Sequence, residues 1–205
     1  MKRFVMLLLG VLAIPAAASA AISGTGGATT ISGGKATLVS NGTSPYSTIS
    51  FNDLVGQSLN ALTDLSANVD SAQYGGGAPR FSVELSNGNS VFVYLGAAPD
   101  YTSGVPGDTG NLLSDSVDTS QIGGTFYDTW ADAEALAGTS TITRIDFVVD
   151  AGWATGGSQT VVLNSVTING STYGFLTKDD CRNGGWQTAG YKNQGACVSA
   201  FASGK

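Results

Sequence analysis

The chain has 205 residues, of which 29 are glycine and only 12% are charged, and its 15 acidic and 9 basic residues give a net charge of −6. This length predicts one main domain with a sizeable apolar core. The acidic balance, without any run of basic residues, excludes nucleic acid and anionic membrane surfaces as partners, because both would repel the protein.

The first twenty residues have the three-part pattern of a cleavable export signal. Lys2 and Arg3 precede an apolar run over residues 4–14, and the small residues at 18–20 form a cleavage site. We expect cleavage after Ala20, secretion from the cell and no membrane insertion after the signal is removed. A membrane anchor is the weaker alternative, because the run is shorter than the ~20 residues that cross a bilayer. Loss of the two leader cations brings the net charge to −8.

Residues 35–176 have the patterning of an all-β domain, preceded by a flexible lead-in over residues 21–34. Glycine, serine, threonine, asparagine and valine are abundant, which is typical of strands and turns. Asn87-Gly88 between two apolar runs predicts a tight hairpin, and Asn169-Gly170 predicts a second turn. Strands are predicted at residues 36–39, 47–51, 81–85, 91–95, 141–149, 160–168 and 171–175.

Parts of two predicted strands, residues 145–149 and 161–163, do not alternate regularly between apolar and polar side chains. Central strands that are buried on both faces have this pattern, which favours an antiparallel two-sheet sandwich over a barrel. Only residues 130–136 have a helical pattern, and it stops at Gly138. We therefore expect at most one short helix.

The two cysteines of the chain, Cys181 and Cys197, have 15 residues between them. In an exported chain they predict a disulfide rather than a thiol nucleophile or a metal ligand. The bond would close a C-terminal tail over residues 177–205 and stabilise it by about 3 kcal/mol in the chain-entropy model.

Catalysis is constrained by the absence of histidine from the sequence. A Ser-His-Asp triad, a Cys-His site and a zinc site built on imidazole are excluded. A glycoside hydrolase needs only two carboxyl groups, and Glu84 and Glu134 are the two glutamates. Most acidic residues of such a chain are solvated surface charges, so we predict no catalytic residue and no enzymatic activity.

Residues 100–118 contain four aspartates and Asn111 in a loop-like stretch, which is oxygen-rich chemistry that suits calcium. The spacing does not match an EF-hand. An ordinary loop whose Asp and Asn side chains bond their own backbone is the favoured interpretation. We predict no metal and no cofactor, with structural calcium left open.

Aromatic side chains are the candidates for recognition, because flat rings stack against sugar faces and other apolar ligands. The candidate ligand-binding residues are Tyr101, Tyr127, Trp130 and Trp153, which lie in or beside loop-like stretches, whereas Phe126 is expected in the core. Residues 75–77 are three glycines that precede a strand rather than a helix, which indicates a tight backbone crossing and not a phosphate cradle.

Four motifs occur in an order that resembles that of uncharacterised secreted bacterial proteins with a lectin-like jelly-roll domain. They are GGGAPRF (75–81), TGNLL (109–113), GGTFYDTW (123–130) and VDAGW (149–153). The tail is similar to a C-x-N-G-G-W and K-N-Q-G-x-C-V ending found in many secreted bacterial proteins. The resemblance implies a jelly-roll-like sandwich, a fold of which several members bind carbohydrate. It supplies no catalytic residue, because fold alone does not fix function.

The sequence therefore favours a secreted, non-catalytic binding module for a glycan or cell-surface polymer such as extracellular polysaccharide. A structural or envelope-associated protein without a small ligand is the alternative, and a carboxylate-only glycoside hydrolase is the second alternative. Exposed aromatic residues gathered at one loop cluster would favour the binding module. The oligomeric state and the identity of the ligand stay open.

Overall fold

The computed structural model of the chain describes residues 22–96, 98, 99, 101, 104, 106–188 and 191–202. The predicted export signal and its cleavage site lie outside these residues. None of the helices in the described part of the chain is long and apolar enough to span a membrane.

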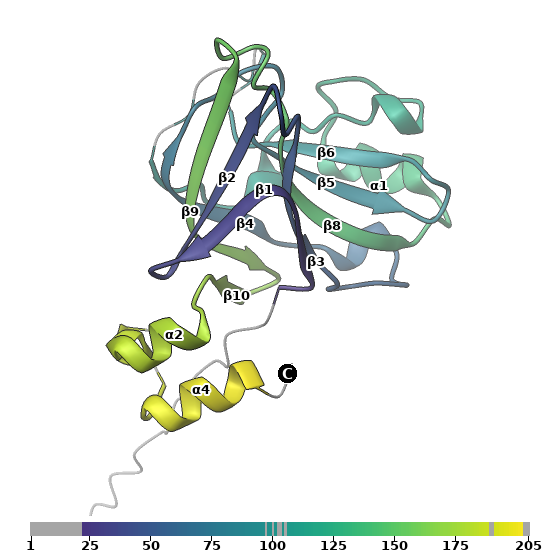
Figure 1. Cartoon of the computed structure of the whole chain (residues 1–205). Helices are drawn as coiled ribbons and strands as arrows, with labels where there is room; N and C mark the ends of the chain where they lie inside the picture. The colour runs from purple at the N-terminus through teal and green to yellow at the C-terminus, as the bar shows by residue number, and fades with distance from the viewer. Residues whose placement is uncertain are drawn as a thin grey trace, which may run out of the picture.

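The strands form one curled antiparallel sheet whose two halves share the strand β1, drawn in purple in Figure 1. One half runs from β1 through β3, β8 and β5 to β6, and the other from β1 through β2, β9 and β4 to β7, with β10 on β9. The strands are β1 (Gly24–Ser32), β2 (Lys35–Asn41), β3 (Ser47–Phe51), β4 (Leu65–Ala72), β5 (Arg80–Leu85), β6 (Ser90–Tyr94), β7 (Gly107–Asp108), β8 (Ile142–Val149), β9 (Ser158–Ile168) and β10 (Ser171–Gly174).

The strand β1 changes partner at its centre. Gly27 pairs with Ser47 of β3, and the next residue, Ala28, pairs with Val39 of β2. Gly27 has a φ of +64°, and a Cβ atom there would lie 1.9 Å from the carbonyl oxygen of Tyr46. The bend therefore requires glycine.

The prediction of a flexible lead-in over residues 21–34 is wrong for residues 24–32, which form β1. The segment has no fully buried side chain, so the apolar pattern that marks the other strands is missing. Backbone hydrogen bonds to strands on both sides hold it in place. The strands β4 and β7 are also additions to the predicted set.

The mostly antiparallel β architecture is confirmed, and so is the hairpin at Asn87-Gly88, which joins β5 to β6. A single apolar cluster contains buried residues from both halves of the sheet. Phe81 and Phe147 meet edge to face with ring centroids 5.1 Å apart. Each large apolar side chain removed from water in this cluster contributes about 1.5–3 kcal/mol.

The predicted helix is present as α1 (Trp130–Ala137). It begins at a capping box formed by Thr129 and Asp132 and ends at Gly138. The expectation of at most one short helix is wrong, because the tail after β10 is helical. Thr177 and Asp180 form a second capping box there. The tail elements, which lie below the sheet in Figure 1, are α2 (Lys178–Asp180), the kinked turn η4 (Cys181–Gly185), α3 (Trp186–Thr188) and α4 (Gln194–Ala202).

The predicted disulfide is confirmed, with Cys181 and Cys197 joined and their Cα atoms 5.7 Å apart. It fixes the end of α2 against α4. The remaining short elements are 3₁₀ turns at η1 (Leu59–Ala61), η2 (Leu112–Ser114) and η3 (Ser120–Ile122).

Candidate ligand-binding site

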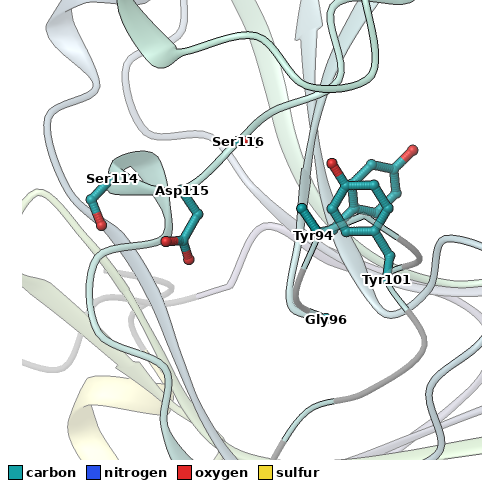
Figure 2. Close-up of a pocket in the computed structure, with 7 residues that line it drawn as sticks. Tyr94, Gly96, Tyr101, Ser114, Asp115 and Ser116 are labelled. Atoms are coloured by element: carbon teal, nitrogen blue, oxygen red, sulfur yellow. The ribbon is translucent and has the colours of Figure 1, made fainter.

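A cavity of about 430 Å³ lies beside the end of β6. Figure 2 shows the rings of Tyr94 and Tyr101 on one side of it, with Ser114 and Asp115 on the other. The cavity is lined by Tyr94, Gly96, Ala98, Tyr101, Ser114, Asp115 and Ser116.

Three tyrosine rings lead from the wall of this cavity to the surface. The rings of Tyr94 and Tyr101 have centroids 4.1 Å apart, and Tyr101 and Tyr127 are stacked at 6.2 Å with 20° between their planes. Tyr101 is 8% exposed, whereas Tyr127 is 54% exposed. We call these residues, Tyr94, Tyr101 and Tyr127, the tyrosine stack.

Each hydroxyl group of the tyrosine stack is bonded to the protein. Tyr94 donates to Oδ2 of Asp118 at 2.8 Å, Tyr101 to the carbonyl oxygen of Phe126 at 2.7 Å, and Tyr127 to that of Pro99 at 3.1 Å. The hydroxyl groups position the rings. Because Tyr101 is buried and contacts both of its neighbours, the exposed ring of Tyr127 is the part of the tyrosine stack on which a ligand can stack.

Burial raises the pKa of Tyr94, and the hydrogen bond to Asp118 and the negative charge of that carboxylate raise it further. Burial also raises the pKa of Tyr101. Burial thus favours the neutral form of both phenols.

The backbone at Tyr101 has a φ of +52°, in the left-handed region that bulky residues rarely adopt. Gly96 allows the chain to reach this position, since a Cβ atom there would lie 2.7 Å from the carbonyl carbon of Tyr101. The strained backbone directs the ring between those of Tyr94 and Tyr127.

The loop that carries Tyr127 is fixed by Asp128. The hydroxyl group of Thr119 donates to Oδ2 of Asp128, and so does the backbone amide of Thr125, at 2.7 Å. These hydrogen bonds, that of Thr119 first, lower the pKa of Asp128. The exposed ring at the outer end of the tyrosine stack is thus presented by an ordered loop.

A second cavity, of about 240 Å³, lies under Trp153. The Trp153 side chain is 78% exposed, the largest exposure among the large hydrophobic residues described. The cavity is lined by Ser40, Asn41, Gly42, Pro45, Asp150, Trp153 and Gly157.

Comparisons with known proteins leave the site to be judged on its own geometry. No protein-family model, curated protein or solved structure matches this chain. The assignment below therefore rests on the contacts of the described residues.

The structure places two of the four sequence-predicted ligand-binding residues, Tyr101 and Trp153, in the lining of these cavities, and Tyr127 against the ring of Tyr101. Tyr101 and Tyr127 belong to the tyrosine stack, and Trp153 lines the second cavity. Trp130 is elsewhere: it packs against the core, and its indole nitrogen donates to the carbonyl oxygen of Leu62 at 3.1 Å. The expectation that Phe126 lies in the core is wrong, because its side chain is 54% exposed.

Sequence reasoning missed Tyr94, Asp115 and Asp150. Tyr94 lies in a predicted strand, where it alternates with the buried Val93, and this alternation places it on the face away from the core. That alternation was the available signal. Asp115 and Asp150 had none, since each is one carboxylate among 15 acidic residues.

The two glutamates are on different elements, Glu84 on β5 and Glu134 on α1, and neither lines either cavity. The guanidinium group of Arg144 bridges Glu84, at 2.7 Å from Oε1, and Asp146, at 2.8 Å from Oδ2. The space between these two carboxylates is thus occupied by a cation.

Among the residues that the structure describes, no group of three or more acidic or cysteine side chains could hold a metal ion. Asp108 accepts a hydrogen bond from the amide of Gly110, Asn111 from that of Leu113, and Asp118 from that of Ser120. These side chains bond nearby backbone, as ordinary loop residues do. Asp100 lies outside the described residues.

Proposed function

We propose that the protein is a secreted, non-catalytic module that binds extracellular polysaccharide or a related cell-surface polymer, built on a jelly-roll-like two-sheet sandwich. The tyrosine stack carries the proposal. Its hydroxyl groups are bonded to the protein, so its rings are held as flat apolar platforms. Sugar rings have apolar faces that stack on such platforms.

The polar groups of the first cavity complement the rings. Ser114, Asp115 and Ser116 line it opposite Tyr94 and Tyr101. Hydroxyl and carboxylate oxygens can accept the hydrogen bonds that sugar hydroxyl groups donate. This combination suits a sugar better than a purely apolar ligand.

The exposed aromatic residues favour binding over a purely structural role. Phe126 and Tyr127 are each 54% exposed, and Trp153 is 78% exposed. Large aromatic rings that are exposed to solvent add no buried apolar surface to the core and therefore do not stabilise the fold. A structural protein without a ligand would have these rings buried.

The proposal includes no catalytic step. Glycoside hydrolysis needs two carboxyl groups about 5–10 Å apart across the scissile bond. Asp115 is the only carboxylate among the described residues that line the first cavity, and Asp150 is the only one in the second. Asp150 is paired with Arg80, so neither cavity presents a free acid and base together.

A binding assay on insoluble polysaccharides tests the proposal. The chain without its leader is mixed with cellulose, chitin, xylan, starch and cell-wall preparations, with and without calcium. We expect retention on at least one polymer, reduced by about tenfold or more in Tyr127→Ala, because each stacked ring contributes roughly 0.5–1.5 kcal/mol beyond its buried area. Tyr127→Phe keeps the ring and should retain binding.

Val55→Ala serves as a control, because Val55 is 52% exposed but lines neither cavity. Thermal unfolding of each variant separates loss of binding from loss of folding. Absence of retention on every polymer would overturn the proposal and leave the structural alternative.

A further inference from the structure

One aromatic lining residue of each cavity lies against the same glycine turn, Gly76-Gly77. A Cβ atom at Gly76 would lie 2.9 Å from Cζ2 of Trp153, and one at Gly77 would lie 3.0 Å from Cε1 of Tyr94. These glycines are consecutive, with Cα atoms about 3.8 Å apart, so the two rings approach to within about 13 Å of each other. The turn thus lies between the ring of Trp153, which lines the second cavity, and the ring of Tyr94, which lines the first.

Arg80 holds the glycine turn in place. Its Nη1 donates to the carbonyl oxygen of Gly77 at 3.1 Å, and its guanidinium group pairs with Asp150, which lines the second cavity. The same guanidinium group lies over the ring of Phe92, 5.0 Å from the centroid. The two aromatic surfaces therefore have a fixed separation before any ligand arrives.

We propose that one uncharged polysaccharide chain crosses the glycine turn and occupies both cavities together, with one sugar on the tyrosine stack and another on Trp153. This inference rests on the proposed function and specifies its ligand. A repeating ligand is favoured because two apolar platforms at a fixed distance match the repeated apolar faces of a polymer. Preorganised subsites then add their binding free energies at low entropic cost.

The negative charge of the protein favours an uncharged polymer over an acidic one. The chain has a net charge of −6, and Asp115 faces the first cavity without an ion pair to any described basic side chain. No basic residue is among the described residues that line either cavity. A polyuronate or sulfated polymer would be repelled by this field.

The test is a length series measured by calorimetry, with oligosaccharides of two to six units from cellulose, chitin and xylan, and polygalacturonate as the charged probe. We expect affinity to rise by about tenfold or more from two to six units. Trp153→Ala should remove most of this rise, because only one of the two subsites is left. Trp153→Phe should keep most of the rise, and affinity should not depend on salt concentration.

Equal affinity for short and long ligands, or full length dependence in Trp153→Ala, would overturn the two-cavity inference while the proposed function stands, provided that Tyr127→Ala loses binding. Preferential binding of polygalacturonate would overturn the charge assignment. Failure to bind any of these polymers would overturn both the inference and the proposed function.

Discussion

Arg80 of β5 and Asp150, which follows β8, form a two-point ion pair in which Nη1 to Oδ1 and Nη2 to Oδ2 are each 2.7 Å apart. The two side chains are 16% and 31% exposed, so solvent screens the pair only in part. The parallel arrangement uses the planar fork of arginine, which lysine does not have. This pair determines where the glycine turn lies.

Arg80→Lys keeps the charge but loses the two-point geometry. We expect the free energy of unfolding to fall by about 1–2 kcal/mol, because charge-assisted hydrogen bonds are lost from a partly buried site. Urea unfolding measures the change. Lys35→Gln is the comparison, since Lys35 pairs with Asp70 at a surface where both side chains are more than 40% exposed, and there we expect less than about 0.5 kcal/mol. Equal losses in the two variants would contradict this account.

Gly77→Ala places a methyl group against the ring of Tyr94 at a residue whose φ is +74°. We expect lower stability, by about 1 kcal/mol or more, and weaker retention on polysaccharide. Gly88→Ala is the matched control, because Gly88 has a φ of +83° and nothing within 4 Å of the added atom. It should lose stability by backbone strain alone and bind normally. Normal binding by both variants would show that the ring position does not matter.

The pH dependence of stability has a contribution from Asp146, which is 5% exposed. Burial raises its pKa above the ordinary value near 4, against the opposing effect of Arg144. A raised pKa means that the stabilising contribution is complete at low pH and is lost as pH rises through the folded-state pKa. The unfolding free energy of Asp146→Asn should therefore increase relative to the natural protein as pH rises from about 4 to 7.

Asp180 gives the opposite trend. Its pKa is lowered, first by the hydrogen bond from the Thr177 hydroxyl group, so its contribution exists above the unfolded-state pKa and is lost as pH falls. Asp180→Asn should therefore lose stability relative to the natural protein as pH rises through the acidic range. Urea unfolding at a series of pH values measures both variants, and parallel trends would refute the assignments.

Removal of the disulfide should affect the tail more than the sheet. In Cys181→Ser combined with Cys197→Ser, we expect the tail to lose about 3 kcal/mol of local stability. Amide hydrogen exchange should become fast in α2 and α4 while the central strands stay protected. Glycan binding should be unchanged, because none of the tail residues that the structure describes lines either cavity. Equal loss of protection in β8 would show that the tail supports the sheet.

The sequence was most informative where side chains alternate and turns are tight. The bounds of β3 at Ser47–Phe51 match the predicted strand, and Gly138 ends α1 as expected. It failed at β1, whose residues are held by backbone hydrogen bonds on both sides and not by a buried face. Hydrogen bonds to distant strands leave no local pattern to recognise.

The candidate site was predictable only in the aromatic residues of its loops. Tyr101, Tyr127 and Trp153 lie in loop-like sequence, where rings are unexpected in a core. Trp130 has the same sequence context, but the tertiary fold turns its indole toward Leu62. The pairing of Tyr94 with Tyr101, and of Gly76 with Trp153, depends on how separate loops meet, which spacing along the chain does not encode.

The shared strand β1 links the formation of the two halves of the sheet. Its neighbours β3 and β2 pair with β8 and β9, so Ser47 joins Val149 and Ala36 joins Leu163 across more than 100 residues. Only residues 150–157 separate β8 from β9. Docking of the β8–β9 segment brings together strands that are more than 100 residues apart in the sequence, so we expect slow refolding.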